Sequence, residues 1–475
     1  MSSFNSISKN SFFLASSQVV EKGLYYLMVV VLARYLGKGD YGRLTYALSF
    51  AGLFTFFWDF GLGRLITRDV AKDLSNAAIT FSLRFELQII SCLAGLVGLL
   101  FYLISFEGGN LQTYLVLIIS ITVVFNYLSS SFRSVFIAFE KAKYEMFFNL
   151  AFRSALFLAI LWATYKQLGL IEISLILLLL SLSSLFCSWK LVDRGYFNLH
   201  FIRAPARLWL IVKDCFPIAI TIAFTSFYLQ INKILLLKWK GVEATGVYGA
   251  ADVIVMSLLI ISNSLVLATF PIMSRENRID KAKTFFIYRG VFKVLVSFGL
   301  PIVLGGMLLS REIILLIYGT EFSEASDVLK ILIWFTPLLF LTNFTGSCLI
   351  AIEKQKLLAF ICGLNLLLNL SLNLILIRPF GYVGAAAASI ATEGINLIIQ
   401  YRCLRSYWGA SVFEKSWLKV LFPLGLMAIF IQWAQGRNIF LILFGAVGIY
   451  FFSLFTVKFY FPMRLSDITT WVVKR

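Results

Sequence analysis

Long apolar segments follow one another along this chain with little between them. About fourteen of them approach or exceed the roughly 20 residues that a helix needs to cross a bilayer. The expected spans are approximately 11–36, 41–62, 84–106, 112–138, 144–165, 169–190, 208–238, 246–271, 285–309, 327–351, 357–378, 381–404, 416–433 and 438–461. The longest connections, 191–207 and 310–326, are too short for a catalytic domain. The sequence therefore predicts a polytopic membrane protein.

The spans are predicted to be helices rather than barrel strands. Of the 475 residues, 60% are apolar and 14% are charged, which suits lipid rather than water as the solvent. A segment in lipid must bond its backbone internally, which leaves helices or a closed barrel. Continuous apolar runs such as 173–185 and 364–377 lack the alternation of barrel strands. We expect an all-α bundle.

The net charge of +18 comes from basic residues that gather between alternate spans. One side of the predicted membrane carries roughly three times as many of them as the other, and such an excess marks the cytoplasmic side. This distribution predicts cytoplasmic termini and an even number of spans, and it does not form the single patch expected of a nucleic-acid-binding protein. The six cysteines have no paired spacing, and with a single histidine no metal site or cofactor is expected.

Three short motifs recur in the same order at offsets of about 204 to 213 residues. The matching pairs are 137–143 with 350–356, Gly37 and Gly42 with Gly241 and Gly246, and 169–171 with 381–383. Such repeats predict two parallel six-helix lobes followed by two further helices. The expected parts are an N-lobe at 1–190, a cytoplasmic linker at 191–207, a C-lobe at 208–405, and the last two spans with a cytoplasmic tail at 406–475.

Several motifs resemble those of the polysaccharide biosynthesis proteins, the Wzx-type O-antigen flippases. This family belongs to the multidrug/oligosaccharidyl-lipid/polysaccharide exporter superfamily. The resemblance rests on ARYLG at 33–37, DYG at 40–42, DFGL at 59–62, RD at 68–69, GVYGAA at 246–251 and FPIMSR at 270–275.

The resemblance implies a flippase rather than an enzyme. Its cargo would be an undecaprenyl-pyrophosphate-linked O-antigen or polysaccharide repeat unit, moved across the bacterial inner membrane by alternating access. Membrane lipids are expected partners, and an O-antigen polymerase and a chain-length regulator are candidate partners. The alternative is a multidrug or small-solute exporter of the same superfamily, although internal cations would repel cationic drugs.

Such a cargo requires a polar, partly cationic cavity, so charges inside spans are the candidate site. A charge at mid-bilayer costs on the order of 2.5–3.5 kcal/mol, and such charges usually face a cavity or a partner. Two helical faces are polar, and their candidate substrate-binding residues are Gln18, Lys22 and Tyr25 beside Glu21 in the first span, and Thr225, Tyr228 and Asn232 in the seventh. The alternative is that these residues are hydrogen-bonding contacts between helices.

Other charged residues complete the candidate site. Arg153 and Lys293, with Lys22, are candidate pyrophosphate contacts, because both residue types bind phosphate. Arg64 and Arg68 could receive the head group first, or could simply set the topology. The acids Glu21, Asp252 and Glu393 are candidates for coupling or charge balance, with structural ion pairing as the alternative.

Overall fold

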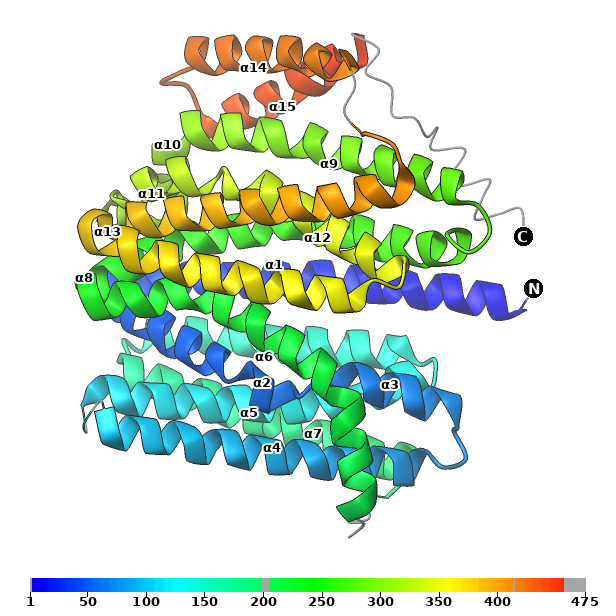
Figure 1. Cartoon of the computed structure of the whole chain (residues 1–475). Helices are drawn as coiled ribbons and strands as arrows, with labels where there is room; N and C mark the ends of the chain where they lie inside the picture. Colours follow the sequence, from blue (N-terminus) through cyan, green and yellow to red (C-terminus); the bar gives the residue numbers. More distant parts are fainter. Residues whose placement is uncertain (1, 107, 109, 199–204, 413–414, 457–475) are drawn as a thin grey trace. The chain divides into compact units, whose positions relative to one another are not determined.

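Helices make up all the regular structure in residues 2–106, 108, 110–198, 205–412 and 415–456, which the computed structural model describes (Figure 1). The predicted all-α class is confirmed. The chain divides into two units, Met1–Gly249 and Ala250–Arg475. Part of the predicted linker and the tail beyond residue 456 lie outside the described residues.

The elements run in a simple order. The first unit contains α1 (Ser2–Leu53), α2 (Thr55–Asp59), α3 (Leu62–Lys72), α4 (Ala77–Phe106), α5 (Leu111–Ala138), α6 (Ala142–Tyr165), α7 (Leu170–Gly195) and most of α8 (Pro205–Glu276). The second contains the end of α8, α9 (Lys281–Leu308), α10 (Ser310–Tyr318), α11 (Ala325–Leu332), α12 (Phe335–Ala351), α13 (Gln355–Trp408), α14 (Leu421–Trp433) and α15 (Ile439–Thr456), with short 3-10 helices at Thr320–Phe322 and Lys415–Val420.

Glycine interrupts the three longest helices. Helix α1 breaks at Gly37 (φ 69°), α8 at Gly241 (φ 87°) and α13 at Gly381 (φ 57°), in a backbone region that other residues rarely adopt. Within the described residues, eight helices are long and apolar enough to cross a membrane, and α11 with α12, bent by 43°, makes a ninth. Because each broken helix contains two of the predicted spans, the structure is consistent with about fourteen of them.

Two glycines at equivalent places in the predicted repeat cross each other in the first unit. A Cβ atom on Gly42 would lie 1.9 Å from the Val242 carbonyl oxygen, and one on Gly246 would lie 2.2 Å from that of Lys38. The repeat offset relates Gly42 to Gly246 and Lys38 to Val242, so each contact mirrors the other, as contacts about a two-fold axis do. An ion pair of 2.9 Å joins Lys38 to Glu243 beside the crossing. This reciprocity supports the repeat, whereas the lobe boundaries stay a prediction.

The predicted span 41–62 is not one continuous helix. Helix α1 ends at Leu53, and after α2 the chain turns through left-handed conformations at Phe60 and Gly61. Side chains compensate for lost helical bonds: Trp58 Nε1 donates to the Ala51 carbonyl at 2.8 Å, and Gln88 Nε2 donates to the Trp58 carbonyl at 3.1 Å. Polar backbone inside a membrane protein needs such internal partners, which apolar periodicity does not reveal.

The predicted connection 310–326 is also more ordered than a plain loop. It contains α10 and a short 3-10 helix, because Ile314, Tyr318 and Phe322 bury apolar side chains against the second unit.

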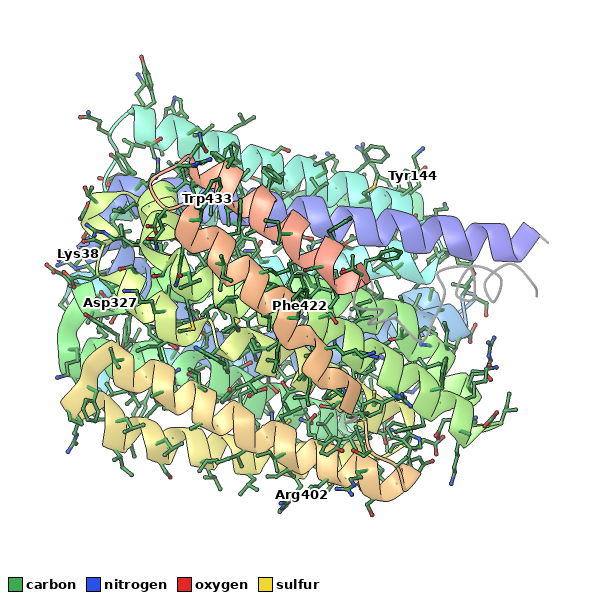
Figure 2. All side chains as sticks on the ribbon, turned by 90° about the horizontal axis from the view of Figure 1, so that it is seen from above. Lys38, Tyr144, Asp327, Arg402, Phe422 and Trp433 are labelled. Atoms are coloured by element: carbon green, nitrogen blue, oxygen red, sulfur yellow. The ribbon has the colours of Figure 1, made fainter. Side chains whose placement is uncertain are left out.

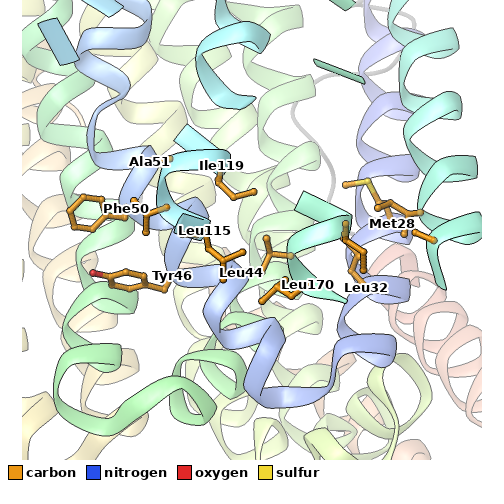
Figure 3. Packing of buried hydrophobic residues seen from close by; sticks show 14 of the residues in the cluster. Met28, Leu32, Leu44, Tyr46, Phe50, Ala51, Leu115, Ile119 and Leu170 are labelled. Atoms are coloured by element: carbon orange, nitrogen blue, oxygen red, sulfur yellow. The ribbon is translucent and has the colours of Figure 1, made fainter. Parts of the chain in front are cut away.

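The core of the first unit holds its helices in register. Helices α1 and α6 pack together, as do α5 and α7. Figure 3 shows Leu32, Leu44 and Phe50 of α1 near Leu115 of α5 and Leu170 of α7, all buried in one cluster. Figure 2 shows Lys38, at the break in α1, and Tyr144, at the start of α6, at opposite ends of this unit. The polar side chains of α1 and α6 therefore lie along a helix pair that runs between the two ends.

Candidate functional site

An ion pair between α1 and α6 brings together three residues of the predicted site. Arg153 donates to Glu21 Oε1 from Nε at 3.2 Å and from Nη2 at 2.8 Å. The Arg153 guanidinium also lies 5.8 Å from the ring centroid of Tyr25, within range of a cation–π contact. The side chains of Arg153 and Glu21 stay 29% and 27% exposed, so this pair can be reached from outside the helix packing.

Lys22 adds a second cation next to this pair. It is half-buried, and within the part of the chain that the structure describes its ammonium forms no hydrogen bond or ion pair. The side chain of Gln18, predicted to share this face, lies outside the described residues. Lys22 therefore has charge available for an anionic ligand.

A second ion pair lies nearer the start of α6, and the sequence analysis missed it. Arg133 of α5 donates from Nε to Glu145 Oε1 at 3.3 Å, and Asn149 donates to the same oxygen at 2.9 Å. Glu145, Asn149 and Arg153 are spaced four residues apart, which places them on one face of α6. That spacing was the available signal. We call Glu21, Arg133, Glu145, Asn149 and Arg153 the polar track.

The seventh-span stripe has a more structural setting. Asn232 and Tyr228 are buried, and Asn232 Nδ2 donates to the Tyr248 hydroxyl at 3.0 Å, across the break in α8. Thr225 is exposed, and its hydroxyl donates to the Thr221 carbonyl in the preceding turn at 2.9 Å. The Asn232 bond agrees with the hydrogen-bonding alternative for that residue, and a substrate role for the stripe stays a prediction.

Arg68 lies in a different polar cluster, at α3 and α4. It donates to both oxygens of Asp69, at 2.6 and 3.0 Å, and Asp69 also binds Arg84 of α4. Burial by itself would raise the pKa of Asp69, but the hydrogen bonds from Arg68 and the charge of Arg84 outweigh it and lower that pKa. Arg68 remains 52% exposed. The side chain of Arg64 lies outside the described residues.

The second unit contains a buried ladder of neutral polar groups around Glu393. The Thr342 hydroxyl and Asn396 Nδ2 donate to Glu393 Oε1, the latter at 3.3 Å. Gln400 donates to Asn396 at 2.9 Å and accepts from the Thr345 hydroxyl at 2.5 Å. We call these five side chains of α12 and α13 the amide ladder. Each is at least nine-tenths buried.

The other predicted residues of this unit are also buried. Asp252 and Lys293 are 5% and 8% exposed, and each has a polar or electrostatic interaction inside the protein. Asn373 donates to Asn369 at 2.8 Å, and Asn369 donates to Thr392 at 3.4 Å. Within the described residues, no group of three or more His, Cys, Asp or Glu side chains could hold a metal ion.

Comparison with known sequences now decides the family. The family model described as "Polysaccharide biosynthesis protein" matches residues 7–276, which is more than half of the chain. The chain belongs to this family. A second model, described as MatE, matches residues 217–375. The resemblance predicted from the sequence motifs is confirmed, and with it membership of the exporter superfamily.

Individual relatives are distant but similar over most of the chain. The probable low-salt glycan biosynthesis flippase Agl15 of Haloferax volcanii is 23% identical, with 84% of each chain covered. The capsular polysaccharide biosynthesis protein CapF of Staphylococcus aureus is 23% identical, with 83% of this chain and 98% of that protein covered. Among solved structures, the lipid II flippase MurJ in an inward closed conformation has the same fold, with a TM-score of 0.72, 15% identity and coverage of 97% and 100%. The chain is thus a multi-pass membrane protein with a transporter fold.

Proposed function

We propose that this protein is a lipid-linked oligosaccharide flippase of the bacterial inner membrane. Its cargo would be an undecaprenyl-pyrophosphate-linked O-antigen or polysaccharide repeat unit, translocated by alternating access without catalysis. The family match, and the names of Agl15 and CapF as proteins of glycan biosynthesis, support a glycan cargo.

The accessible cations of the first unit carry this proposal. Lys22 lacks an internal partner within the described residues, and Arg153 has only the half-exposed Glu21 as its counter-ion. A pyrophosphate could take over hydrogen bonds of the Arg153 guanidinium from Glu21 and attract Lys22 as a point charge, while sugar hydroxyls stack or hydrogen-bond at Tyr25. An ordinary structural ion pair would need no extra cation beside it.

The remaining predicted residues have supporting roles in this proposal. Arg64 and Arg68 would attract the head group, and Lys293 would contact it later in transport. Thr225, Tyr228, Asn232 and Gln18 would line the path, and Glu21, Asp252 and Glu393 would balance charge or couple transport. Both termini and 191–207 would face the cytoplasm, where side-specific labelling of introduced cysteines can locate them.

Reconstitution tests the proposal directly. The purified protein would be placed in liposomes with a fluorescent undecaprenyl-pyrophosphate oligosaccharide, and the fraction of probe reaching the opposite leaflet would be measured with an impermeant quencher. We expect fast exchange for the unaltered protein, slow exchange for Lys22→Ala with Arg153→Ala, and no change for Lys166→Ala, an exposed lysine beyond α6. Exchange no faster than in protein-free liposomes would refute a flippase.

The MatE match favours one alternative, an exporter of drugs or small solutes. Such a protein would clear a cationic dye from loaded liposomes and would leave the lipid-linked probe in place. The proposal requires the opposite pair of results.

A further inference from the structure

One oxygen of Glu145 has no partner in the protein interior. Its Oε1 accepts from Arg133 and Asn149, whereas Oε2 is shielded from solvent and has no hydrogen-bond partner. The Glu145 side chain as a whole is 12% exposed. An unsatisfied carboxylate oxygen in such a place costs roughly 1–3 kcal/mol, so a ligand that satisfied it would be bound favourably.

Arg133 is turned so that it cannot satisfy this oxygen. Its Nη1 donates to the Ser129 hydroxyl at 2.9 Å instead of completing a two-pronged bond to the carboxylate. Ser129 in turn lies 2.9 Å from the Ser184 hydroxyl and 3.1 Å from that of Ser188, both on α7 and both buried. This serine cluster fixes the guanidinium in its single-pronged position.

The charges around Glu145 come from three helices. Arg133 of α5 pairs with it, Glu21 of α1 lies within electrostatic range, and Arg153 of α6 pairs with Glu21. Two carboxylates so close together repel each other in a medium of low dielectric constant. A proton on Glu145 would relieve this repulsion and convert Oε2 from an orphan acceptor into a hydroxyl.

We propose that Glu145 is a proton-binding site that regulates anion binding at the polar track. Hydronium transfers its proton to Oε2 and leaves as water, which removes one negative charge near the phosphate-binding cations. Anion affinity at Arg153 and Lys22 then rises as Glu145 becomes protonated. This proposal rests on the proposed anion-binding role of the track, but the protonation itself can be observed without transport.

Infrared titration of the purified protein tests the protonation step. Difference spectra between about pH 8 and about pH 5, a range that brackets ordinary and perturbed carboxyl groups, report the carbonyl stretch of each newly protonated acid. We expect Glu145→Gln to lose one band, and the matched variant Glu172→Gln, an exposed acid at the start of α7, to keep it. Asn149→Ala removes a donor that favours the ionised form, so its band should appear at higher pH.

Binding of farnesyl pyrophosphate to the same samples tests the consequence. The unaltered protein should bind the probe more strongly as pH falls, and Glu145→Gln should bind it strongly with a pH profile that reflects only the probe. Infrared spectra of Glu145→Gln that match those of the unaltered protein, with no displacement of the band in Asn149→Ala, would refute the proton site. A normal titration without liposome exchange would refute the flippase and leave the proton site intact.

Discussion

The polar track of the first unit and the amide ladder of the second place carboxylates in opposite surroundings. Glu21 and Arg153 form a charged pair whose side chains are more than a quarter exposed. Glu393, in contrast, is 3% exposed, and the contacts defined here come from a hydroxyl and an amide. Both regions join helices that are neighbours in the bundle, α1 with α6 and α12 with α13.

The difference teaches which polar groups the fold can spare. An ion pair this accessible adds at most about 1 kcal/mol to folding, so its partners can be exchanged for a ligand at little cost. Buried hydrogen bonds cannot be exchanged so easily, because each partner removed leaves an unsatisfied group. We therefore expect changes in the track to affect transport first and changes in the ladder to affect stability first.

Charge reversal at Lys22 should break the track most severely. Lys22→Glu would set an acid beside Glu21 and oppose an anionic cargo. We expect export of the lipid-linked glycan to fall by more than the roughly 10- to 150-fold that corresponds to one lost charge-assisted bond of about 1.5–3 kcal/mol. Lys22→Arg keeps the charge and should be milder. Export per unit of inserted protein is the measurement, and near-normal export by Lys22→Glu would remove this residue from the cargo path.

Neutralising single cations should give the next largest effect. Arg153→Ala, Lys22→Ala and Lys293→Ala should each lower export within that roughly 10- to 150-fold range while the protein still inserts. Arg153→Ala also leaves Glu21 without this partner, and Arg153→Ala with Glu21→Gln separates the two causes, since only the cargo contact stays lost in the double variant. Full export by all three alanine variants at limiting copy number would show that these cations serve packing alone.

The ladder should respond in the opposite sense. Glu393→Ala leaves the Thr342 hydroxyl and Asn396 amide without their shared acceptor, so we expect a loss of about 1–3 kcal/mol in stability. Glu393→Gln keeps an oxygen and should cost less. Thermal unfolding in detergent measures both, and export by Glu393→Gln should fall less than export by Arg153→Ala. A larger loss of export than of stability would assign Glu393 a direct role in transport.

The smallest expected effect concerns Asp69, which lies outside both regions. Its folded pKa is lowered, so its stabilising contribution is present above the unfolded value of about 3.9 and is lost as pH falls through the folded value. Asp69→Asn should therefore lower the melting temperature slightly at neutral pH. The difference should vanish in acid, and a difference that persisted there would mean that packing, not charge, accounts for it.

Much of the molecule could be predicted from local pattern. Apolar length fixes the spans because the hydrocarbon thickness is the same for every helix. Gly37 and Gly241 were recognised as equivalent from their spacing alone, and both proved to be helix breaks. The presence of Glu21, Lys22 and Arg153 inside spans was enough to mark them as candidate site residues.

Only the tertiary structure decided which of these groups meet. Arg153 and Glu21 are 132 residues apart, and no periodicity within one helix indicates which other helix will face it. The same holds for Arg133 with Glu145, for Arg68 and Arg84 on Asp69, and for Thr342 with Glu393. A sequence determines which residues share a helical face, because that depends on the local geometry of one segment. The partner across the interface depends on how helices pack, and that is decided by the combined shape and polarity of many side chains.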